Sequence, residues 1–500
     1  MKTILTFDVG TTSMKCCAFD ENLRLIASST AEYSLNTQGA HIVEADPEIY
    51  WNGMCKNIRR LVDNGLNPHD IVVCGITTQG ETSILLDRHG KPLRPAIVWL
   101  DDRAGDQAAF LASNIDKTDF YRTTGLTEIG GALPLAKLRW LNAQDDVRGK
   151  VAKILLLEDY LIYRLTGEIK TEHSIICSTG YYDIQTHTYR EDYLRLADAT
   201  ASILPEVFPC GSIAGTVTKS ASEQCLIPQG TPVAVTAMDQ TASAIGAGNV
   251  MPGDVTETTG TCLTLAATTE KADCTTSAPI QYYTHYDGRY LALAYNATAA
   301  IITKWFKDEF IADTAEFCSS GKNPYTYMSE LAETISAGSD GLIMLPHFAG
   351  KAMPNYSPNV RGCFYGVSLH TGKAHFIRAI MEGVSFMLRE NLESFEKAGI
   401  FVNDICSLGG GSKDNLWCEI KASVTQKTLH TMQMEESTSL GAAILCAKAI
   451  GMTQDVAALA RSTAKTKTTY HPDPNLIDTY TDFYRKYLAL DRVVTAMSDQ

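Results

Sequence analysis

The chain alternates between short runs of β-branched and apolar residues and longer segments whose apolar positions repeat at helical spacing. The first helix is clearly marked: Asp46 is its expected N-cap, Pro47 takes its first position and Gly65 follows its end. Around it the pattern predicts strands at residues 4–8, 14–19, 25–35 and 71–77.

The same order begins again in the second half of the chain. Strands are predicted at residues 255–259 and 263–267, and their Gly-Thr turn repeats the turn of the N-terminal hairpin. Three antiparallel strands followed by a helix and a strand is the order of a ribonuclease-H-like, or actin-like, half. The sequence therefore predicts an α/β protein of two such domains, 1–246 and 247–500, with a cleft between them.

Several further elements follow from the pattern, and most of them are expected to be scaffold. Short strands are predicted at 83–87, 96–100, 232–236, 290–295 and 404–408, and helices at 133–141, 154–165, 301–310, 375–398 and 416–423.

Composition narrows the class of protein. Five hundred residues exceed one ordinary core, and 45% apolar with 20% charged residues is typical of a soluble globular chain. The N-terminus reaches a charge too early for a signal peptide, and no apolar run approaches the ~18–20 residues that span a bilayer. We therefore expect a cytoplasmic protein. Its fourteen cysteines form no Cys-x-x-Cys pair, which favours reduced thiols over disulfides or zinc.

The net charge of −14 argues against nucleic acid or an anionic membrane as a partner. An acidic protein can still bind ATP when backbone N–H groups and a metal, rather than a basic surface, meet the phosphates.

One carboxylate is delivered by a strand to the start of a helix. The run 232–236 leads to Asp239, and the small residues that follow predict a helix N-terminus, a positive setting suited to polar chemistry. A strand-end aspartate is more often an N-cap or turn residue. The Gly-Thr turns at Gly10 and Gly260 favour a catalytic role here.

A second polar cluster follows the strand at 71–77. Its turn holds Gln79 and Glu81, and Trp99 comes soon after, which suggests a small polar pocket with an apolar wall. A loop carboxylate beside a core tryptophan is the alternative.

Phosphoryl transfer needs held phosphates, a divalent metal and an aligned acceptor hydroxyl. The turns at Gly10 and Gly260 can present N–H and hydroxyl donors to phosphates, Asp8 can hold Mg²⁺, and Asp239 can orient the hydroxyl and take its proton. The glycines from Gly409 onward can cover the adenosine end. Each of these turns has a structural alternative, a hairpin with capping threonines or a tight connection.

These motifs resemble those of the FGGY carbohydrate kinases, which include xylulokinases, glycerol kinases and fuculokinases. The resemblance covers essentially the whole chain. Its most specific part is residues 362–382, which fit a family signature throughout; another signature survives at 134–141, although Ala132 departs from its opening position. The first phosphate motif is matched by 8–13, the catalytic-base segment by 238–242, the second phosphate motif by 259–261 and the adenosine motif by 409–412.

The resemblance implies two actin-like domains that close over ATP and a sugar or polyol, with Asp239 as base and Asp8 as the ligand of Mg²⁺. The sequence does not indicate the oligomeric state, and a homodimer is the default expectation for this family. The substrate residues it implies are Gln79, Gly80, Glu81, Trp99, Asp101, Arg103, Asp239 and Gln240. The ATP residues it implies are Gly10, Thr11, Thr12, Ser13, Lys15, Thr259, Gly260, Thr261, Gly409, Gly410, Gly411, Ser412 and Asn415.

The substrate expectation depends on the loop at Gln79. Glycerol kinases have Gln-Arg-Glu-Thr there, and Gly80 removes that arginine; xylulokinases have Gln-Met-His-Gly, so only Gln79 agrees. Asp101 and Arg103 are closer to the xylulokinase form. A glycine at position 80 is expected to leave room for a substrate larger than glycerol, and we expect a pentulose such as xylulose. The alternatives are glycerol or another polyol, and an actin-like ATPase without sugar kinase activity.

Overall fold

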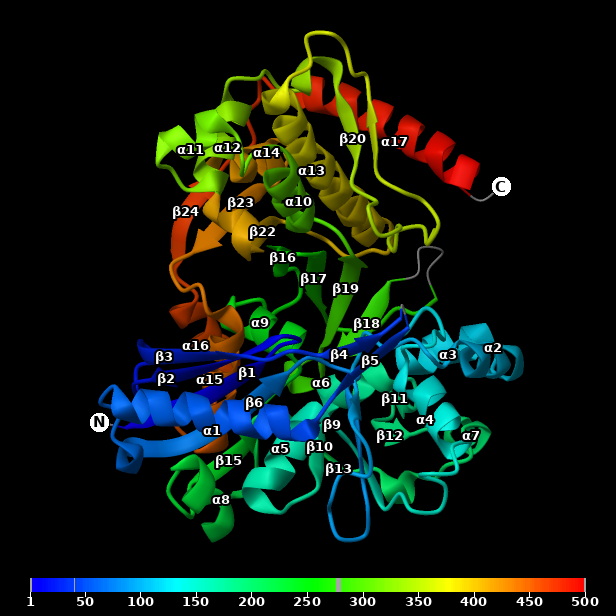
Figure 1. Cartoon of the computed structure of the whole chain (residues 1–500), viewed down its shortest axis with the longest axis vertical. Coiled ribbons are helices and arrows are strands. Elements are labelled where there is room, and N and C mark those ends of the chain that lie inside the picture. Colours follow the sequence, from blue (N-terminus) through cyan, green and yellow to red (C-terminus); the bar gives the residue numbers. More distant parts are fainter. Residues whose placement is uncertain (1, 40, 276–279, 499–500) are drawn as a thin grey trace.

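Two lobes stacked along the long axis make up the molecule (Figure 1). The computed structural model describes residues 2–39, 41–275 and 280–498. Each lobe is built on a large mixed sheet with helices on its faces.

The first lobe contains the predicted N-terminal unit. β1 forms antiparallel pairs with β2, β2 with β3, and β1 runs parallel to β6. The side chain of Asp46 accepts a hydrogen bond from the first turn of α1, as its N-cap position predicts. The six-stranded sheet has the order β14 (Ser212–Thr216), β15 (Pro232–Val235), β6 (Ile71–Thr78), β1 (Thr3–Val9), β2 (Ser13–Phe19), β3 (Leu25–Glu32), and α1 (Pro47–Asp63) packs against β2 and β3.

The second lobe repeats this arrangement. β16 and β17 form the antiparallel hairpin, and β16, β22 and β23 run parallel. The seven-stranded sheet has the order β18 (Gln281–Thr284), β19 (Tyr290–Asn296), β17 (Leu263–Thr269), β16 (Val255–Thr259), β22 (Asp404–Leu408), β23 (Thr428–Met432), β24 (Thr466–Tyr470), and it carries α13 (Lys373–Lys397) and α14 (Asn415–Thr425).

Smaller sheets and further helices complete both lobes. In the first lobe they are β4 (Asn36–Gln38), β5 (Ile42–Ala45), β7 (Ser83–Leu86), β8 (Ala96–Ile97), α2 (Gly105–Asn114), α3 (Lys117–Thr124), α4 (Pro134–Asn142), β9 (Lys153–Leu156), α5 (Leu157–Thr166), β10 (Lys170–Glu172), α6 (His173–Ile176), the 3₁₀ helix η2 (Cys177–Thr179), β11 (Tyr182–Asp183), β12 (Thr188–Tyr189), α7 (Glu191–Leu196), β13 (Glu206–Phe208), α8 (Lys219–Cys225) and α9 (Asp239–Gly246). From the second half of the chain come α10 (Ala300–Phe310), α11 (Ala315–Ser320), α12 (Pro324–Glu333), β20 (Ile343–Leu345), β21 (Cys363–Tyr365), η6 (Gly410–Lys413), α15 (Ser437–Ala449), α16 (Val456–Thr463) and α17 (Ile477–Ser498).

The helix expected at 154–165 is wrong at its start. Residues 154–156 belong to β9, which pairs antiparallel with β7, and α5 begins at Leu157. An apolar run suits a helix or a buried strand equally, so the pairing partner decides. The Asp159 carboxylate accepts a hydrogen bond from the Leu156 N–H (2.8 Å) and fixes the point where the helix begins.

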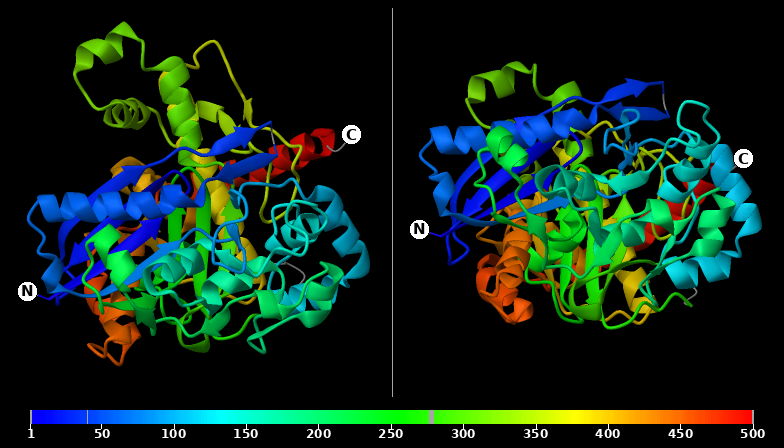
Figure 2. Two further views of the ribbon diagram at one scale, coloured as in Figure 1. Left: turned by 60° about the horizontal axis from the view of Figure 1, so that its bottom comes forward. Right: turned by 90° about the horizontal axis from the view of Figure 1, so that it is seen from below.

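Helix α15 comes from the second half of the sequence but packs on the first lobe, against α9, β1 and β6. It lies beside the blue strands β1–β3 in both views of Figure 2. The contact with α9 depends on two glycines: a Cβ on Gly246 would lie 1.9 Å from the carbonyl oxygen of Ser437, and one on Gly441 would lie 1.8 Å from that of Ala242. Helices α9 and α15 therefore pack in close contact at the point where the chain passes from the first lobe to the second.

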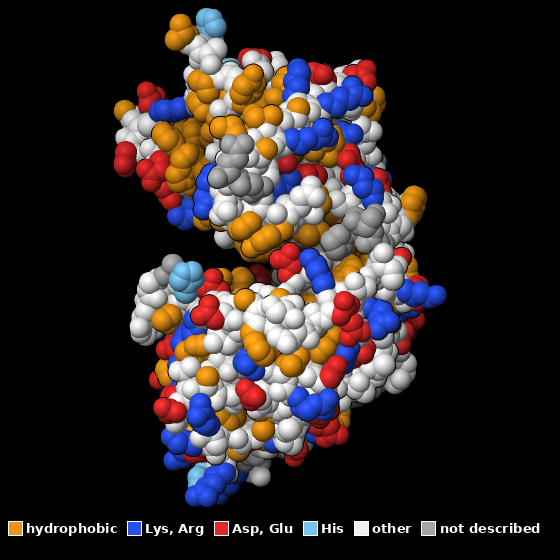
Figure 3. All heavy atoms as spheres, turned by 90° about the vertical axis from the view of Figure 1, so that its right-hand side faces the viewer, with side chains coloured by type: hydrophobic (Ala, Val, Ile, Leu, Met, Phe, Trp, Pro, Cys, Tyr) orange, Lys and Arg blue, Asp and Glu red, His pale blue; other side chains and the backbone are white. Residues whose placement is uncertain are grey.

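The lobes meet along one side and leave the other open. The seam includes hydrogen bonds from the Tyr121 hydroxyl to the carbonyl oxygen of Ile280 (2.8 Å) and from the Tyr282 N–H to that of Gly125 (2.9 Å). On the opposite side Figure 3 shows a deep hollow between the lobes. The predicted cleft is this hollow.

In the part of the chain that the structure describes, no helix is both long and apolar enough to cross a bilayer. The fourteen cysteines are free thiols, most of them buried.

Candidate active site

The first Gly-Thr turn joins the end of β1 to β2 and touches the predicted sugar pocket. The Thr11 hydroxyl donates to Gln79 Oε1 (2.8 Å) and accepts from the Trp99 indole N–H (3.0 Å). Residues predicted separately for phosphate and for sugar thus share one hydrogen-bonded chain. That is the arrangement a transfer between the two substrates requires.

Thr82 is a site residue that the sequence did not single out. Its hydroxyl accepts from the Gln79 side-chain amide (3.2 Å) and from the Trp99 backbone N–H (3.2 Å), so it joins two predicted pocket residues. Its place in the turn after Gln79 was the only sequence indication.

Three half-buried carboxylates, those of Asp8, Glu81 and Asp239, lie close enough to influence one another. Burial raises the pKa of Asp239 to about 7, and the charges of Asp8 and Glu81 add to the effect. Burial also raises the pKa of Asp8 to about 6, although Lys15 opposes it, and raises the pKa of Glu81. Glu81 has a left-handed backbone (φ 55°), a strained conformation typical of functional sites.

A magnesium ion fits the donor chemistry around Asp8. A carboxylate crowded by like charges gains from a hard cation. Among the described residues no group of three or more His, Cys, Asp or Glu side chains can hold a metal, so phosphate and water oxygens would supply the remaining ligands.

Lys15, predicted to bind ATP, is paired with a residue that the sequence analysis missed. Its Nζ donates to both carboxylate oxygens of Glu436 (2.7 Å each), and Glu436 directly precedes α15. Glu436 lies 421 positions away in sequence, so no local pattern indicates the pair.

The second Gly-Thr turn combines a buried network with an open surface. The Thr259 hydroxyl donates to Glu257 (2.7 Å), which also accepts from Lys421 Nζ (2.6 Å), and neither Glu257 nor Lys421 has exposed surface. A Cβ on Gly260 would meet no described atom within 4 Å. The Gly260 N–H donates to the carbonyl oxygen of Cys262 (3.0 Å), so the exposed Thr261, rather than the Gly260 N–H or the Thr259 side chain, is left to face a phosphate.

The glycines predicted for adenosine lie against this turn. Gly409 has φ +77°, and a Cβ on Gly411 would lie 2.7 Å from the Thr259 side chain, whereas one on Gly410 would meet no described atom within 4 Å. The Ser412 hydroxyl donates to the carbonyl oxygen of Gly409 (2.8 Å), and Asn415 Oδ1 accepts from the Tyr470 hydroxyl (2.7 Å). A close backbone approach beside open space suits a nucleotide.

Asp101 and Arg103 brace the loop that carries Trp99. Asp101 has no exposed surface and accepts from the Val43 N–H (2.7 Å) and from Arg103 Nε (2.8 Å). Arg103 Nη1 donates to Glu44 (2.8 Å). With its donors engaged in this way, Arg103 can fix the loop; direct contact with a sugar stays a prediction for both residues.

The space expected next to the Cα of Gly80 is occupied by other side chains. A Cβ there would lie 3.1 Å from Met238 Sδ and 3.2 Å from Ser178 Oγ, so this glycine does not itself leave open space, and the size of the substrate stays a prediction. Two side chains from sequence-distant segments fill the space. Gly80 permits close packing between the pocket and the turn that carries Asp239.

Lys137, from the signature at 134–141, lies buried next to the segment that carries Trp99. Its Nζ donates to the carbonyl oxygen of Val98 (2.9 Å). Burial lowers its pKa to about 8 although Glu81 and Asp101 oppose the shift.

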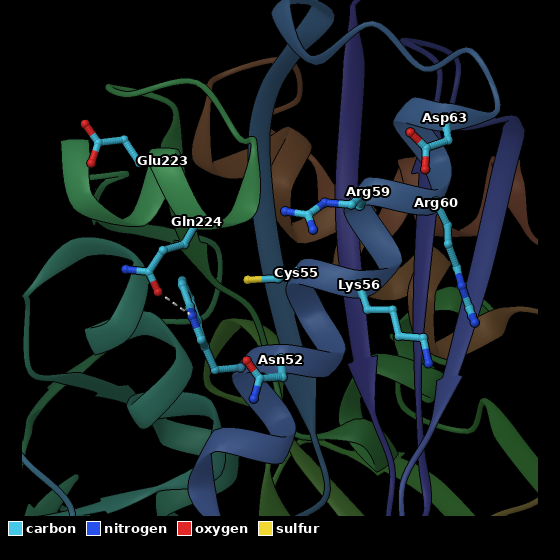
Figure 4. A pocket seen from close by; sticks show the side chains of 9 residues that line it. Asn52, Cys55, Lys56, Arg59, Arg60, Asp63, Glu223 and Gln224 are labelled. Carbon is cyan, nitrogen blue, oxygen red and sulfur yellow. Dashed lines mark hydrogen bonds between the residues drawn. The ribbon is translucent and has the colours of Figure 1, made fainter.

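A separate depression of about 470 Å³ lies between α1 and α8 (Figure 4). Its floor includes Trp51, whose indole N–H donates to Gln224 (2.9 Å), and its rim carries Lys56 and Arg59. None of the predicted site residues lines it.

Two sheets of this order, each with a Gly-Thr turn between its first two antiparallel strands, define the actin-like, ribonuclease-H-like class of two-domain proteins. Family models of the N-terminal and C-terminal domains of the FGGY family of carbohydrate kinases match residues 3–246 and 257–450. The chain therefore belongs to the FGGY family of carbohydrate kinases. It is an ATP-dependent carbohydrate kinase, as the resemblance implied.

Relatives act on different substrates. The chain is 27% identical to a gluconokinase of Bacillus subtilis over 451 residues, covering 90% of this chain and 88% of the relative. It is 24% identical to a xylulose kinase of Staphylococcus xylosus over 450 residues, covering 89% and 91%. The solved xylulose kinase of Lactobacillus acidophilus superimposes with a TM-score of 0.91 at 23% identity, over 100% of this chain and 99% of the other.

Proposed function

We propose that this kinase phosphorylates a hydroxyl of a neutral pentulose such as xylulose, with Asp239 as the base. The observation that carries the proposal is the group of Asp8, Glu81 and Asp239 near the Thr11–Gln79–Trp99 chain. Carboxylate and amide oxygens at a half-buried site are suited to binding sugar hydroxyls.

Asp239 would orient the acceptor hydroxyl and take its proton. A pKa of about 7 makes it a better base than an ordinary aspartate, while leaving about half of it ionised at neutral pH. Gly10 to Thr12 and Gly260 with Thr261 would hold the phosphates from the two lobes, and Gly409 to Ser412 the adenosine. Asp8 would hold Mg²⁺, which neutralises phosphate charge when bound.

The electrostatics favour a neutral sugar over an aldonate. The carboxylates of Asp8, Glu81 and Asp239 lie near one another. The Arg103 guanidinium already donates hydrogen bonds to Asp101 and Glu44. A substrate carboxylate would meet like charges, and the nearby Lys137 is buried and already donates to the carbonyl oxygen of Val98. We therefore prefer a pentulose to gluconate, although the relatives include gluconokinases. Glycerol or another polyol remains the alternative.

An ATP-coupled screen over ketopentoses, ketohexoses, pentitols, glycerol and gluconate tests the proposal, with ADP release compared with phosphorylated product. We expect the highest kcat/KM for a pentulose, at one product per ATP. Strong turnover of glycerol or gluconate with none of any pentulose would overturn the substrate class, and ATP hydrolysis without product would overturn the sugar reaction.

A further inference from the structure

The turn that leads to Asp239 is fixed by hydrogen bonds to buried polar side chains. The Thr236 N–H donates to Glu158 Oε1 (3.2 Å), and the Met238 N–H donates to Ser174 Oγ (2.9 Å). Thr236, Met238, Glu158 and Ser174 are all buried. None of these contacts involves an atom of the proposed reaction.

The orientation of the Ser174 hydroxyl is set by Glu172. The hydroxyl donates to Glu172 Oε1 (2.8 Å), so an oxygen lone pair is left to accept from Met238. The same carboxylate accepts from the N–H groups of Ser174 and Ile175 and so caps α6. Without Ser174 Oγ, the Met238 N–H would be a buried donor without a partner, one residue before Asp239.

One helical turn further along, the same segment reaches the other side of the pocket. The Ser178 hydroxyl donates to the carbonyl oxygen of Ile175 (2.8 Å), and it lies against Gly80, where a Cβ would be 3.2 Å away. Glu81, the next residue, has the left-handed backbone. The Ser178 hydroxyl is also within hydrogen-bonding reach of Glu81; because it has one proton, it donates to either the Ile175 carbonyl or Glu81, and donation to Glu81 opposes the rise in the Glu81 pKa that burial causes.

We infer that residues 172–179 are a positioning element for both substrate-facing carboxylates, in which Ser174 places Asp239 and Ser178 places Glu81. The inference rests on the proposed function, because it takes Asp239 as the base and Glu81 as a sugar-binding group. It adds two positioning residues that contact neither substrate. Their effects are expected to separate: Ser174 acts on the chemical step and Ser178 on sugar binding.

Two alanine variants test this separation. For Ser174→Ala we expect kcat to fall about ten- to a hundredfold, since a displacement of about 1 Å at a reacting group costs up to 10² in rate, with a small change in sugar KM. For Ser178→Ala we expect sugar KM to rise about three- to tenfold, the loss of one hydrogen bond, with a small change in kcat. Equal changes in both parameters for both variants would contradict the inference.

Ser385 supplies the matched control. It is also fully buried, and its hydroxyl donates to the carbonyl oxygen of Met381 (2.7 Å) within α13 of the second lobe. Ser385→Ala should leave kcat and KM unchanged. Thermal unfolding of all the variants shows whether they are folded; if Ser174→Ala does not fold, Ser174→Cys keeps the volume with a weak acceptor and should show the same loss of kcat.

A double variant distinguishes positioning from general damage. If Ser174 acts through Asp239, adding Ser174→Ala to Asp239→Asn should lower the residual rate by less than twofold, because the group it places is already lost. An additive loss, or wild-type kcat in folded Ser174→Ala, would overturn the inference and leave the proposed function intact. Wild-type turnover in Asp239→Asn would instead overturn the proposed function itself.

Discussion

The two Gly-Thr turns have the same backbone setting and different charges. Each connects antiparallel strands, β1 to β2 in the first lobe and β16 to β17 in the second. Two residues before the glycine, the first turn has Asp8 and the second has Thr258. Glu257, the carboxylate of the second turn, lies one position earlier and is buried against Lys421.

This difference follows from the alternation of strand side chains. Neighbouring residues in a strand point to opposite faces, so a shift of one position takes a carboxylate from the cleft to the interior. We therefore expect the carboxylate of Asp8 in the first lobe to act in the reaction and that of Glu257 in the second lobe to stabilise the fold. The tests that distinguish these two roles measure both the turnover rate and the free energy of unfolding of each variant.

The largest effect is expected at Asp239 of the first lobe. Asp239→Asn should lower kcat about 10²- to 10⁴-fold, because the amide cannot take a proton. A native pKa of about 7 means that the folded state keeps this proton more tightly than the unfolded chain. Ionisation of Asp239 therefore lowers the stability of the protein as pH rises from the ordinary aspartate value to about 7, and the variant should melt at a higher temperature than wild type at pH 8. Lower stability with normal turnover would reverse the assignment.

The second lobe should show the opposite behaviour at Glu257. Glu257→Gln leaves the Lys421 ammonium buried without its counter-charge, and we expect a loss of about 3–5 kcal/mol in the free energy of unfolding. The kcat of the folded protein should change less than about twofold. Denaturant unfolding and activity of the same preparations measure both. Glu257→Gln with Lys421→Met, which removes the charge pair together, should recover part of the loss.

The features of the two turns that could be predicted from the sequence are those that depend on neighbouring residues. The hairpins, the capping of α1 by Asp46 and the turn glycines all follow from neighbouring residues. The start of α5 was wrong because pairing with β7 decides it. Glu436, which pairs with Lys15, and Ser174, which bonds to Met238, are joined to their partners only by the tertiary fold. The filled space at Gly80 is of the same kind, since Met238 and Ser178 come from distant segments.

The threonines of the two turns should affect different substrates. Thr11→Ala removes an acceptor for Trp99 and a donor to Gln79, so sugar KM should rise about tenfold, as expected for one to two lost hydrogen bonds. Thr261→Ala should raise the KM for ATP about threefold and leave the sugar KM unchanged. Thr11→Ser, which keeps the hydroxyl, is the control. If both alanine variants raised only the KM for ATP, the link between the first turn and the sugar pocket would be wrong.

The smallest effect is expected from pH alone. Asp239 must be ionised to accept a proton, and with a pKa of about 7 its ionised fraction rises from about one half at pH 7 to about nine tenths at pH 8. The kcat/KM for the sugar should therefore rise about twofold over this step and fall about tenfold per unit at lower pH. The same profile for Glu257→Gln should be unshifted, because that carboxylate faces the interior of the other lobe. If the acidic limb of the kcat/KM profile shifted in Glu257→Gln, the titrating group would lie in the second turn. A profile that is flat from pH 5 to pH 8 would exclude a carboxylate base with a raised pKa.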